Sequence, residues 1–379
     1  MAEQPLQLSA IGNTLEEFKS SHPVARVIDT YKDQLEELFV IRNPSSRFTG
    51  KDEKAWETFL HSHLQGKSID EAGEWFYFPW NKTLVHYLEE NLHQELRTAR
   101  NKNVITAEEQ DKLYRAAIGI TGLSVGSHAA LTIAMMGMAK NLKIADPDTI
   151  SGSNLNRIRY DFTIVGENKC RVAARTIYQI NPYANLTQYE EGITPDNIAH
   201  FFDDNPKPAI LVEELDNLEM KIRLRIEAKK RGIPVIMATD NGDNVIVDVE
   251  RYDQDPNLPL FHGAAGNLTL EEFQNFPPQE LPKLATKIAG ASVVVPRMLG
   301  SLLQVGKTLY SWPQLGDAAT LSGVAVAYLV KRIILGEPVK SGKYEVNLDA
   351  IFDPHYNDTD AVARREEARA KYLKQLGFE

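Results

Sequence analysis

The sequence predicts an α/β fold: a mostly parallel, Rossmann-like sheet with helices on both faces, and a smaller α+β unit before it. Two observations predict this fold. The apolar run 116–121 breaks into a glycine-rich turn that leads into an apolar helical segment, 131–139. After that segment, strand-like apolar runs alternate with stretches of helical periodicity as far as residue 250. Such alternation is typical of parallel sheets, in which helices connect successive strands.

Composition excludes several classes of protein. A net charge of -10 argues against a general nucleic-acid binder. The single cysteine, Cys170, excludes an internal disulfide and a four-cysteine zinc site. The first residues have no basic and apolar regions of a signal peptide, and Lys or Arg interrupts the apolar runs short of a membrane span. We therefore expect a cytoplasmic protein that binds neither nucleic acid nor membrane.

The chain divides by pattern into three segments. Residues 1–95 form an N-terminal helical and aromatic unit, residues 96–350 form the main domain, and residues 351–379 include a charged helix. Within the first segment, residues 15–39 have the spacing of one or two amphipathic helices. The aromatic run 75–80 could be a ligand platform, but packing against the next domain is the favoured interpretation, because large aromatic side chains are usually buried.

The main domain has a regular succession of expected elements. A helix after residue 106 should be capped by Thr106, with Glu109 completing a capping box. We expect strands at 142–146, 185–189, 209–213, 234–238 and 244–250. We expect helices at 169–180, 194–202, 217–231, 293–309, 320–335 and 361–376. The small residues of the helix 320–335 would suit either a dimer interface or internal packing.

The glycine turn predicts a nucleotide site. Gly122, Ser124 and Gly126 lie between the first strand and its helix, where glycine lets the backbone approach phosphate and the helix N-terminus supplies N–H donors. Asp146 follows about 24 residues after Gly122 at a strand end, where it could accept hydrogen bonds from ribose hydroxyls. The turn lacks the second and third glycines of G-x-G-x-x-G, so alone it could serve NAD, FAD, ATP or no ligand.

Four further motifs narrow this interpretation. They are the run 146–157, which ends in Ser-Asn-Leu-Asn-Arg, the run 166–169, which ends in lysine, the pair Asn181-Pro182, and the run 214–217, Glu-Leu-Asp-Asn. With the glycine turn, and in this order, they resemble the ThiF/MoeB family, the adenylating half of the ubiquitin-activating enzymes. The resemblance covers roughly residues 94–336.

The resemblance implies an ATP-dependent adenylyltransferase that joins a carboxylate to the α-phosphate of ATP, releases pyrophosphate and uses Mg²⁺. It implies that Asp146 binds the ribose, that Asn154 and Arg157 contact the phosphates, that Lys169 bridges the α- and β-oxygens, and that Asp216 ligates Mg²⁺. The implied catalytic residues are Arg100, Arg157, Lys169 and Asp216. The implied nucleotide-binding residues are Gly122, Ser124, Gly126, Asp146, Asn154, Arg157 and Lys169.

Arg100 has a particular role in this resemblance. Arg97-Thr-Ala-Arg100-Asn101 matches an R-x-x-R-[NQ] element whose second arginine reaches into the ATP site of the partner subunit. The resemblance therefore implies a homodimer. Plainer interpretations remain for each of these residues: Arg100, Arg157 and Lys169 as surface charges, Asp146 as a turn cap, and Asp216 as the N-cap of the helix that follows it.

Several features depart from the family pattern. Ser124 replaces a glycine and the turn is one residue short, which leaves the phosphate path open. The paired C-x-x-C motifs are absent, so we expect no zinc. No cysteine follows Asp216, and Cys170 lies in a predicted helix, so we expect no internal thioester. The enzyme should stop at the acyl-adenylate or pass the acyl group to an external nucleophile or to one within the substrate.

The acyl substrate is left open by the sequence. A small molecule, a peptide or a carrier-protein C-terminus would each supply the carboxylate. A related bacterial subgroup is often fused to a nitroreductase domain, so a separate flavin nitroreductase-like partner is conceivable. Two other functions also remain: a Rossmann oxidoreductase that binds NAD, against which the motifs at 154–157 and 169 speak, and a non-catalytic nucleotide-binding scaffold, which the altered glycine turn allows.

Overall fold

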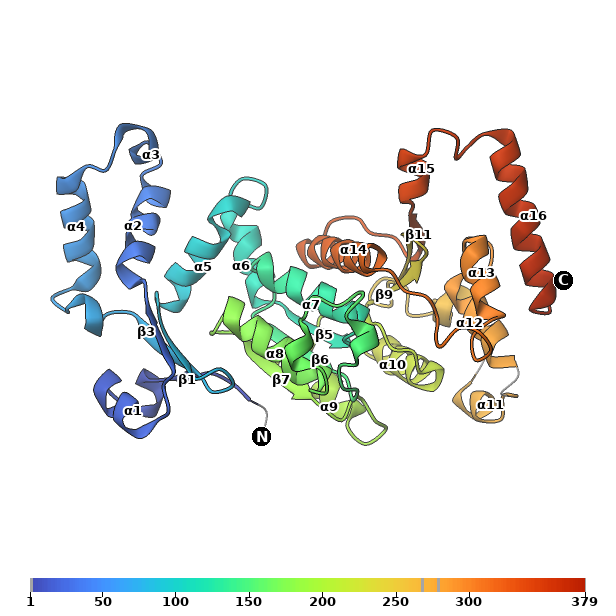
Figure 1. The fold of residues 1–379 in the computed structure, drawn as a ribbon, viewed down its shortest axis with the longest axis horizontal. Coiled ribbons are helices and arrows are strands. Elements are labelled where there is room, and N and C mark those ends of the chain that lie inside the picture. Colours follow the sequence, from blue (N-terminus) through green and yellow to red (C-terminus); the bar gives the residue numbers. More distant parts are fainter. Residues whose placement is uncertain (1–2, 267–268, 278–279, 379) are drawn as a thin grey trace. The chain divides into compact units, whose positions relative to one another are not determined.

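The computed structural model describes residues 3–266, 269–277 and 280–378. The chain forms two compact units. One consists of Met1–Asp111, Met135–Gly137 and Ala174–Ala184, and the other of Lys112–Ala134, Met138–Ala173 and Asn185–Glu379. The ribbon in Figure 1 follows the chain through both units.

The second unit is built on a seven-stranded sheet in the order β11-β10-β9-β8-β5-β6-β7. The five strands from β9 to β7 pair in parallel, whereas β10 and β11 are antiparallel additions at one edge. The strands are β5 (Ala117–Thr121), β6 (Asn141–Ala145), β7 (Asn185–Tyr189), β8 (Ile210–Glu213), β9 (Val235–Asn241), β10 (Asn244–Glu250) and β11 (Gly342–Val346). This sheet confirms the predicted α/β fold.

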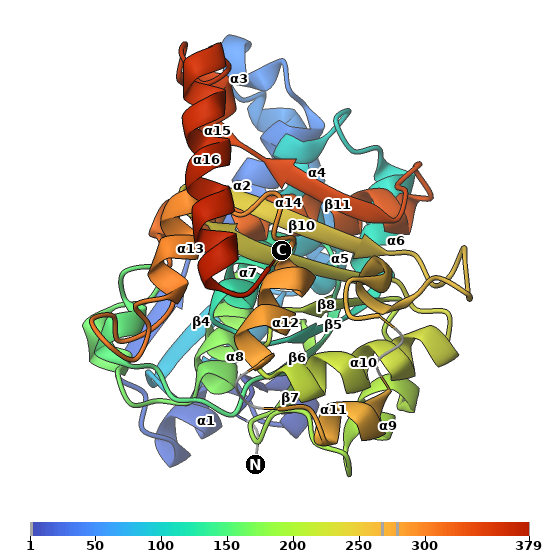
Figure 2. The same ribbon diagram turned by 90° about the vertical axis from the view of Figure 1, so that its right-hand side faces the viewer.

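Helices lie on both faces of this sheet (Figures 1 and 2). The helices are α7 (Val125–Met135), α8 (Lys169–Ile180), α9 (Ile198–Asp203), α10 (Leu218–Lys230), α11 (Leu270–Gln274), α12 (Leu281–Ala289), α13 (Pro296–Leu302), α14 (Gly316–Leu335), α15 (Leu348–Phe352) and α16 (Thr359–Gln375). The part of α8 from Ala174 on, and Met135 of α7, fall in the first unit. Leu224 of α10 packs in one cluster with Leu211 of β8 and Val235 of β9. Because β5 and β8 are buried at every position, they read in sequence as continuous apolar runs.

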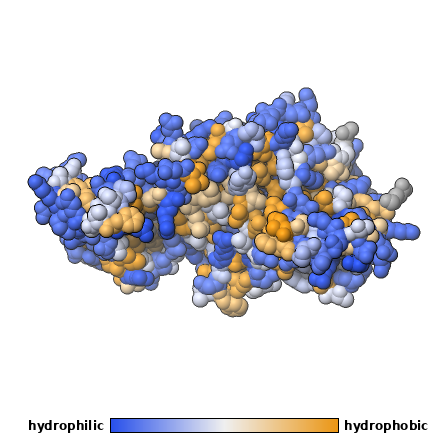
Figure 3. Space-filling view, turned by 90° about the horizontal axis from the view of Figure 1, so that it is seen from above, coloured by the Kyte–Doolittle hydropathy of each residue, from blue (hydrophilic) through white to orange (hydrophobic). Residues whose placement is uncertain are grey.

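Helix α14 packs along the sheet against β9 and β10. Gly323 permits a close approach: a Cβ atom there would lie 2.4 Å from the Cβ of His128 on α7. Of the helices in the described residues, α14 alone is long and apolar enough to cross a membrane. A helix that is buried in a protein core can have the same length and composition. Its other face exposes Val324 and Tyr328, and Figure 3 shows apolar residues interspersed among hydrophilic ones on one face of the molecule.

The first unit contains a four-stranded sheet in the order β1-β3-β4-β2. Its strands are β1 (Leu6–Gln7), β2 (Arg26–Asp29), β3 (Glu74–Phe78) and β4 (Thr83–Tyr87). Its helices are α1 (Leu15–Ser21), α2 (Tyr31–Arg42), α3 (Ser46–Thr49), α4 (Glu53–Leu64) and α5 (Glu90–Thr98), and α6 (Ala107–Arg115) begins in it. At the start of α6 the predicted capping box is present, because Thr106 N–H donates to Glu109 Oε2 at 2.8 Å and Glu109 N–H donates to Thr106 Oγ1 at 3.3 Å.

The aromatic run 75–80 is largely strand β3, and the side chains of residues 75–78 are buried within this unit. Trp75 stacks on His86 with ring centroids 4.3 Å apart, and Phe76 meets Tyr183 edge-on at 4.9 Å. Both partners belong to the same unit. The run therefore forms part of the core of the small sheet.

Most predicted elements are shifted in their bounds by one to four residues, such as the helix predicted at 194–202, which is α9 and begins at Ile198. Three predictions differ from the structure by more than that. Residues 15–39 are interrupted by β2, which pairs in parallel with β4. The helix predicted at 293–309 is only α13, which starts at Pro296, where the missing proline N–H costs nothing. Helix α7 begins at Val125, six residues before the predicted start. The prediction missed its first turn because that turn is buried, and its apolar residues cannot be distinguished by periodicity from the preceding strand.

Candidate functional site

The site lies where the strand order reverses. From β5 the chain builds β6 and β7 on one side, then returns to place β8 and β9 on the other. Since β5, β6 and β8 are parallel, their carboxyl ends share one edge of the sheet. Gly122 follows β5, Asp146 follows β6 and Asp216 follows β8 by three residues. Open parallel sheets place their ligands at such a reversal.

Gly122 is required by the geometry of the turn. Its φ is +82°, and a Cβ atom there would lie 2.4 Å from the carbonyl oxygen of Glu214. Gly126, in the first turn of α7, is less constrained, because its nearest neighbour, a methyl group of Ile120, would lie at 3.3 Å. The two glycines thus let β5 and α7 pack closely against the segment after β8. Ser124, between them, is partly exposed.

Asp146 ties the end of β6 to the glycine turn. Its Oδ2 accepts a hydrogen bond from the N–H of Leu123 at 2.6 Å, and its Oδ1 accepts one from the N–H of Asp148 at 2.9 Å. The carboxyl group is buried, and burial raises its pKa, although the Lys169 ammonium and the two backbone donors act in the opposite direction. Asp146 thus organises the turn.

Lys169 begins α8 and points toward two carboxylates. Its Nζ lies 2.8 Å from Asp148 Oδ2 and 3.7 Å from Asp146 Oδ1. Asp148 is exposed, whereas Lys169 is buried except for a small fraction of its surface. The ammonium group is therefore held in place at the edge of the site, with a solvent-facing carboxylate as its nearest anionic partner.

Arg157 reaches back to the glycine turn. Its Nε donates to Ser124 Oγ at 3.2 Å, and its Nη1 donates to Ser153 O at 3.1 Å. Burial lowers its pKa, and the nearby carboxylates of Asp240 and Asp216 partly offset this effect. Asn154 closes the preceding turn, because its Oδ1 accepts from the N–H of Ser151 at 3.0 Å.

Asp216 is exposed in the loop after β8. Within the described residues its carboxylate has no hydrogen-bond or ion-pair partner in contact. The expected alternative role as a helix cap is wrong: α10 begins at Leu218, and Asn217 Oδ1 accepts from the N–H of Met220 at 2.9 Å. Because Asn217 caps the helix, the carboxylate of Asp216 is not used as a cap and is available to a ligand.

A buried network of ion pairs holds the loop that carries Asp216. Glu213 Oε1 accepts from the N–H of Leu215 at 2.7 Å, and its other oxygen accepts from Arg225 Nη1 at 2.5 Å. Arg225 also donates to Glu250 at 2.6 Å. Burial opposes ionisation of Glu213, but Lys221 and Arg225 outweigh it and lower the pKa. The network fixes the end of β8 to α10 and β10.

A polar cavity of about 630 Å³ gathers most of the predicted residues. Its walls include Ser124, Asn154, Arg157, Lys169 and Asp216. Gly122, Gly126 and Asp146 lie behind them as supports and are not part of its lining. Arg100 belongs to the first unit, in a single helical turn, Ala99–Asn101, and is exposed.

The donor set of this cavity fits a Mg²⁺ bound together with phosphates. Magnesium usually takes one or two carboxylates and completes its shell with water and substrate phosphate oxygens. Asp216 supplies one exposed carboxylate at a strand's carboxyl end. Among the described residues, no group of three or more His, Cys, Asp or Glu side chains could hold a metal by itself.

Sequence reasoning missed Trp312 and Gln314, which line the polar cavity, and Asp240, whose carboxylate accepts a hydrogen bond from Gln314. Asp240 is buried near the end of β9, where its Oδ1 accepts from Ser322 Oγ at 2.9 Å and its Oδ2 accepts from Gln314 Nε2 at 3.4 Å. Burial raises the pKa of Asp240 to about 6. The available signal was the polar run Thr-Asp-Asn-Gly-Asp directly after the apolar residues 234–238, at the same edge of the sheet as Asp216.

Trp312 and Gln314 come from the loop before α14. Asn156 Nδ2 donates to Gln314 O at 2.7 Å, and a Cβ atom on Gly316 would lie 2.8 Å from Asn156 O. This loop therefore packs directly on the segment that carries Arg157. This loop is far along the chain from the predicted motifs, and no sequence pattern indicated that it belongs to the site.

Comparison with known proteins shows which family the sequence of this chain resembles. Residues 97–309 match the model of the ThiF family. An uncharacterised protein of Mycobacterium tuberculosis is 36% identical over 285 residues, which are 75% of this chain and 39% of that protein. The tRNA threonylcarbamoyladenosine dehydratase of Escherichia coli is 29% identical over 146 residues, which are 37% of this chain and 53% of that protein. The chain thus spans about half or less of these relatives.

A sulfur carrier protein adenylyltransferase of Thermus thermophilus is 27% identical over 202 residues, 52% of this chain and 69% of that protein. Among solved structures, the E. coli tRNA N6-threonylcarbamoyladenosine dehydratase in complex with ATP superposes with a TM-score of 0.45 and 20% identity, over 64% of this chain and 95% of that one. Since the family model covers more than half of the chain, and its match includes the glycine turn, Lys169 and Asp216, this protein belongs to the ThiF family.

Proposed function

We propose that this protein is an ATP-dependent adenylyltransferase, which activates a substrate carboxylate as an acyl-adenylate and releases pyrophosphate. The observation that carries the proposal is the polar cavity at the strand reversal. The segment after β6, the start of α8 and the loop after β8 bring Arg157, Lys169 and Asp216 to its walls. Membership of the ThiF family, which includes relatives named as adenylyltransferases, supports the same reaction.

The charges of the cavity suit a triphosphate. Arg157 and Lys169 supply two cations, and α7 begins at Val125, so its first N–H groups and its positive end face the glycine turn. The guanidinium of Arg157 is oriented by its bonds to Ser124 and Ser153. Preorganised donors of this kind stabilise charge that develops during reaction without having to reorient.

In the proposed reaction, a carboxylate oxygen of the substrate attacks the α-phosphorus of ATP. The bond between that phosphorus and the bridging oxygen breaks, and pyrophosphate leaves with the electron pair. Lys169 would hold the α- and β-phosphate oxygens, and Arg157 the outer phosphates. A Mg²⁺ held by Asp216 and phosphate oxygens would neutralise charge on the leaving pyrophosphate.

We further propose that the acyl group does not pass to a cysteine of this chain. Cys170 is buried in α8, and its thiol donates to the carbonyl oxygen of Ile144 at 3.4 Å. Burial raises the pKa of this thiol to about 12. A thiol that stays protonated at neutral pH and cannot reach solvent is a poor nucleophile. The acyl acceptor is then an external nucleophile or one in the substrate.

The test is ATP–pyrophosphate exchange measured with a panel of carboxylates, alongside calorimetry with ATP–Mg²⁺ and with NAD. We expect ATP–Mg²⁺ to bind, and exchange to appear only when an accepted carboxylate is present. Tight binding of NAD with none of ATP would favour an oxidoreductase instead. Binding of ATP without exchange on any carboxylate would favour a non-catalytic nucleotide-binding protein.

A further inference from the structure

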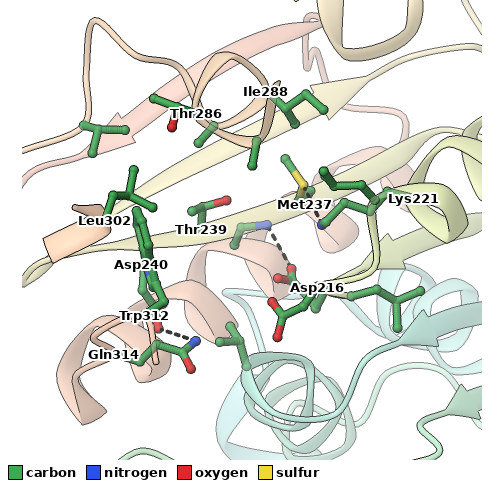
Figure 4. Close-up of a pocket in the computed structure, with 18 of the residues that line it drawn as sticks. Asp216, Lys221, Met237, Thr239, Asp240, Thr286, Ile288, Leu302, Trp312 and Gln314 are labelled. Atoms are coloured by element: carbon green, nitrogen blue, oxygen red, sulfur yellow. Dashed lines mark hydrogen bonds between the residues drawn. The ribbon is translucent and has the colours of Figure 1, made fainter. Parts of the chain in front are cut away.

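A second cavity, of about 480 Å³, opens next to the polar one. The two cavities share four lining residues, Ser124, Asp216, Trp312 and Gln314. Figure 4 shows Asp216, Asp240 and Gln314 on one side of this second cavity and Thr286 and Ile288, on α12, on the opposite side. A molecule that occupies it would therefore have one end beside the residues proposed to bind phosphate and Mg²⁺.

The walls of the second cavity are mainly apolar. They include Leu218, Met237, Ile288, Leu302 and the indole of Trp312. These side chains come from α10, β9, α12, α13 and the loop before α14, so elements that are not neighbours in sequence close the cavity. Concave apolar sites with a few polar groups at one end are the usual form of small-ligand sites.

The polar groups of this cavity do not suit a second anionic group. Lys221 is the cation on its wall, and it is already held by Glu213, with its Nζ 3.0 Å from Oε1. Glu214 accepts a hydrogen bond from the N–H of Ala238 at 2.9 Å. Two further acids line the cavity: Asp216 at the shared mouth, and Asp240, which accepts a hydrogen bond from Ser322. An anion in this cavity would meet carboxyl groups rather than a free cation.

We propose that this cavity holds the apolar body of the acyl substrate: a carboxylic acid with bulky aliphatic or aromatic groups next to its carboxyl, such as a peptide that ends in leucine or phenylalanine. The proposal rests on the proposed function and narrows it, because a tail that ends in Gly-Gly has no side chains to fill the apolar walls. The carboxyl group would lie at the shared mouth beside Asp216, and the apolar groups would extend toward α12.

The size of the expected preference follows from burial. Removing a leucine or phenylalanine side chain from water stabilises the bound state enough for a roughly 10–100-fold preference over glycine. We therefore expect kcat/KM for ATP–pyrophosphate exchange to be roughly 10–100-fold higher with N-acetyl-Ala-Ala-Phe or N-acetyl-Ala-Ala-Leu than with N-acetyl-Ala-Gly-Gly.

Two variants on one helix separate the cavity from general effects. Ala285 lines the cavity from α12, so Ala285→Trp would fill it. Lys287 is on the same helix but is exposed and does not line the cavity, so Lys287→Trp is the matched control. We expect Ala285→Trp to lower kcat/KM for the two apolar peptides at least 10-fold, with ATP binding unchanged, and Lys287→Trp to leave both quantities unchanged.

A third variant covers the case in which Ala285→Trp does not fold. Leu302→Ala removes part of the wall, and it should shift the preference from the leucine peptide toward the larger phenylalanine peptide. Equal or better exchange with the Gly-Gly peptide in the wild-type protein would overturn the inference and leave the proposed function standing. No exchange with any of the three peptides, although ATP binds and calorimetry shows no binding of the apolar peptides, would overturn the inference as well. Failure of ATP to bind would instead reject the proposed function.

Discussion

At the scale of single residues, the proposed role of Lys169 in holding phosphate follows from how its ammonium group is positioned. Its ammonium group is nearly buried and lies between Asp146 and Asp148, and the nearer of these, Asp148, is exposed. A phosphate that enters the cavity would replace a solvated surface carboxylate as its partner. The lysine would therefore be positioned before the nucleotide arrives, at little cost in reorganisation.

We predict that Lys169→Ala lowers the rate of adenylation by roughly 10²–10³, the scale for the loss of one preorganised stabiliser of charge. The fold should survive, because Asp146 keeps its two backbone N–H donors. The measurement is kcat for pyrophosphate exchange, with a thermal melt of each protein. Arg171→Ala is the control, since Arg171 is a cation on the same helix that pairs with Glu190 at 2.5 Å. Equal loss in both variants would remove the special role of Lys169.

Asp240 should make the stability of the protein depend on pH. Its pKa in the folded protein is about 6, above the ordinary value of 3.8, because of burial. Between these two values the folded state binds more protons than the unfolded state, so the free energy of unfolding falls as pH rises through that window. The loss is complete above about pH 6 and amounts to about 3 kcal/mol at most.

Asp240→Asn keeps the shape of the side chain and removes its charge. We predict that this variant is more stable than the wild-type protein at pH 7 by about 1–3 kcal/mol, and that the difference shrinks toward pH 4. Urea unfolding at several pH values measures it. Asp196→Asn, at an exposed position, should show no such change. A pH-independent difference between Asp240→Asn and the wild type would show that the carboxyl does not titrate in this range.

Cys170 offers a third test at this scale. Its buried thiol, with a pKa raised to about 12, should react very slowly with a thiol reagent such as dithionitrobenzoate in the native protein and quickly in denaturant. We predict that Cys170→Ala retains adenylation and that no acyl group accumulates on the wild-type thiol. Mass spectrometry of the enzyme during turnover would reveal a reductant-sensitive adduct if this prediction is wrong.

At the scale of elements, the site depends on how closely the end of β5 and the start of α7 approach the loop after β8. Gly122 is the point of contact. Its backbone is in the left-handed conformation, and the carbonyl oxygen of Glu214 lies too close to leave room for a Cβ atom. The ion network around Glu213 then holds that loop from the other side. A shift of either element would displace Asp216.

We predict that Gly122→Ala destabilises the protein by several kcal/mol, because the φ of +82° costs about 1–2 kcal/mol and the clash with Glu214 adds to it. Gly166→Ala is the matched control: Gly166 has a φ of +93° but no atom within 4 Å of an added Cβ, so it bears the backbone strain alone. Chemical denaturation of the two variants should separate them by roughly 2 kcal/mol or more. Equal losses would mean that the contact with Glu214 relaxes freely.

At the scale of the whole molecule, the family resemblance places Arg100 in the ATP site of a partner subunit. Arg100 belongs to the first unit, whereas Arg157, Lys169 and Asp216 belong to the second. A homodimer with two composite sites, each completed by Arg100 of the other subunit, is therefore a prediction of the family resemblance. An arginine fork that arrives from another subunit could pair with phosphate oxygens that the cavity leaves exposed.

We predict that Arg100→Ala and Asp216→Ala, each inactive alone, restore activity when they are mixed and allowed to exchange subunits. In a mixed dimer one composite site would carry both lesions and the other neither, so activity should approach half of the wild-type value per mixed dimer. Exchange would be verified with differently tagged subunits. No recovery after verified exchange would place Arg100 in the site of its own chain or outside the reaction.

The sequence by itself determined the elements whose signal is local. The bounds of α8, β7 and β10 were predicted to the residue, because periodicity and flanking turn residues are properties of neighbours in the chain. Lys169, Arg157 and Asp216 were placed together by the resemblance of their motifs to the ThiF family, and the shared carboxyl edge of parallel strands agrees with that placement. The short strand β2 was missed, since it is mostly exposed and depends on its pairing with β4.

Tertiary structure alone decided the rest of the site. Asp240 becomes a buried acid only because α14 brings Ser322 against it, and the loop before that helix adds Gln314 and Trp312. The apolar cavity takes its walls from elements far apart in the chain, among them α10, β9, α12 and α13, none of which has an unusual sequence of its own. Packing between distant segments sets both the shape of a cavity and the electrostatic surroundings of a buried carboxyl, and no local pattern in the chain records either.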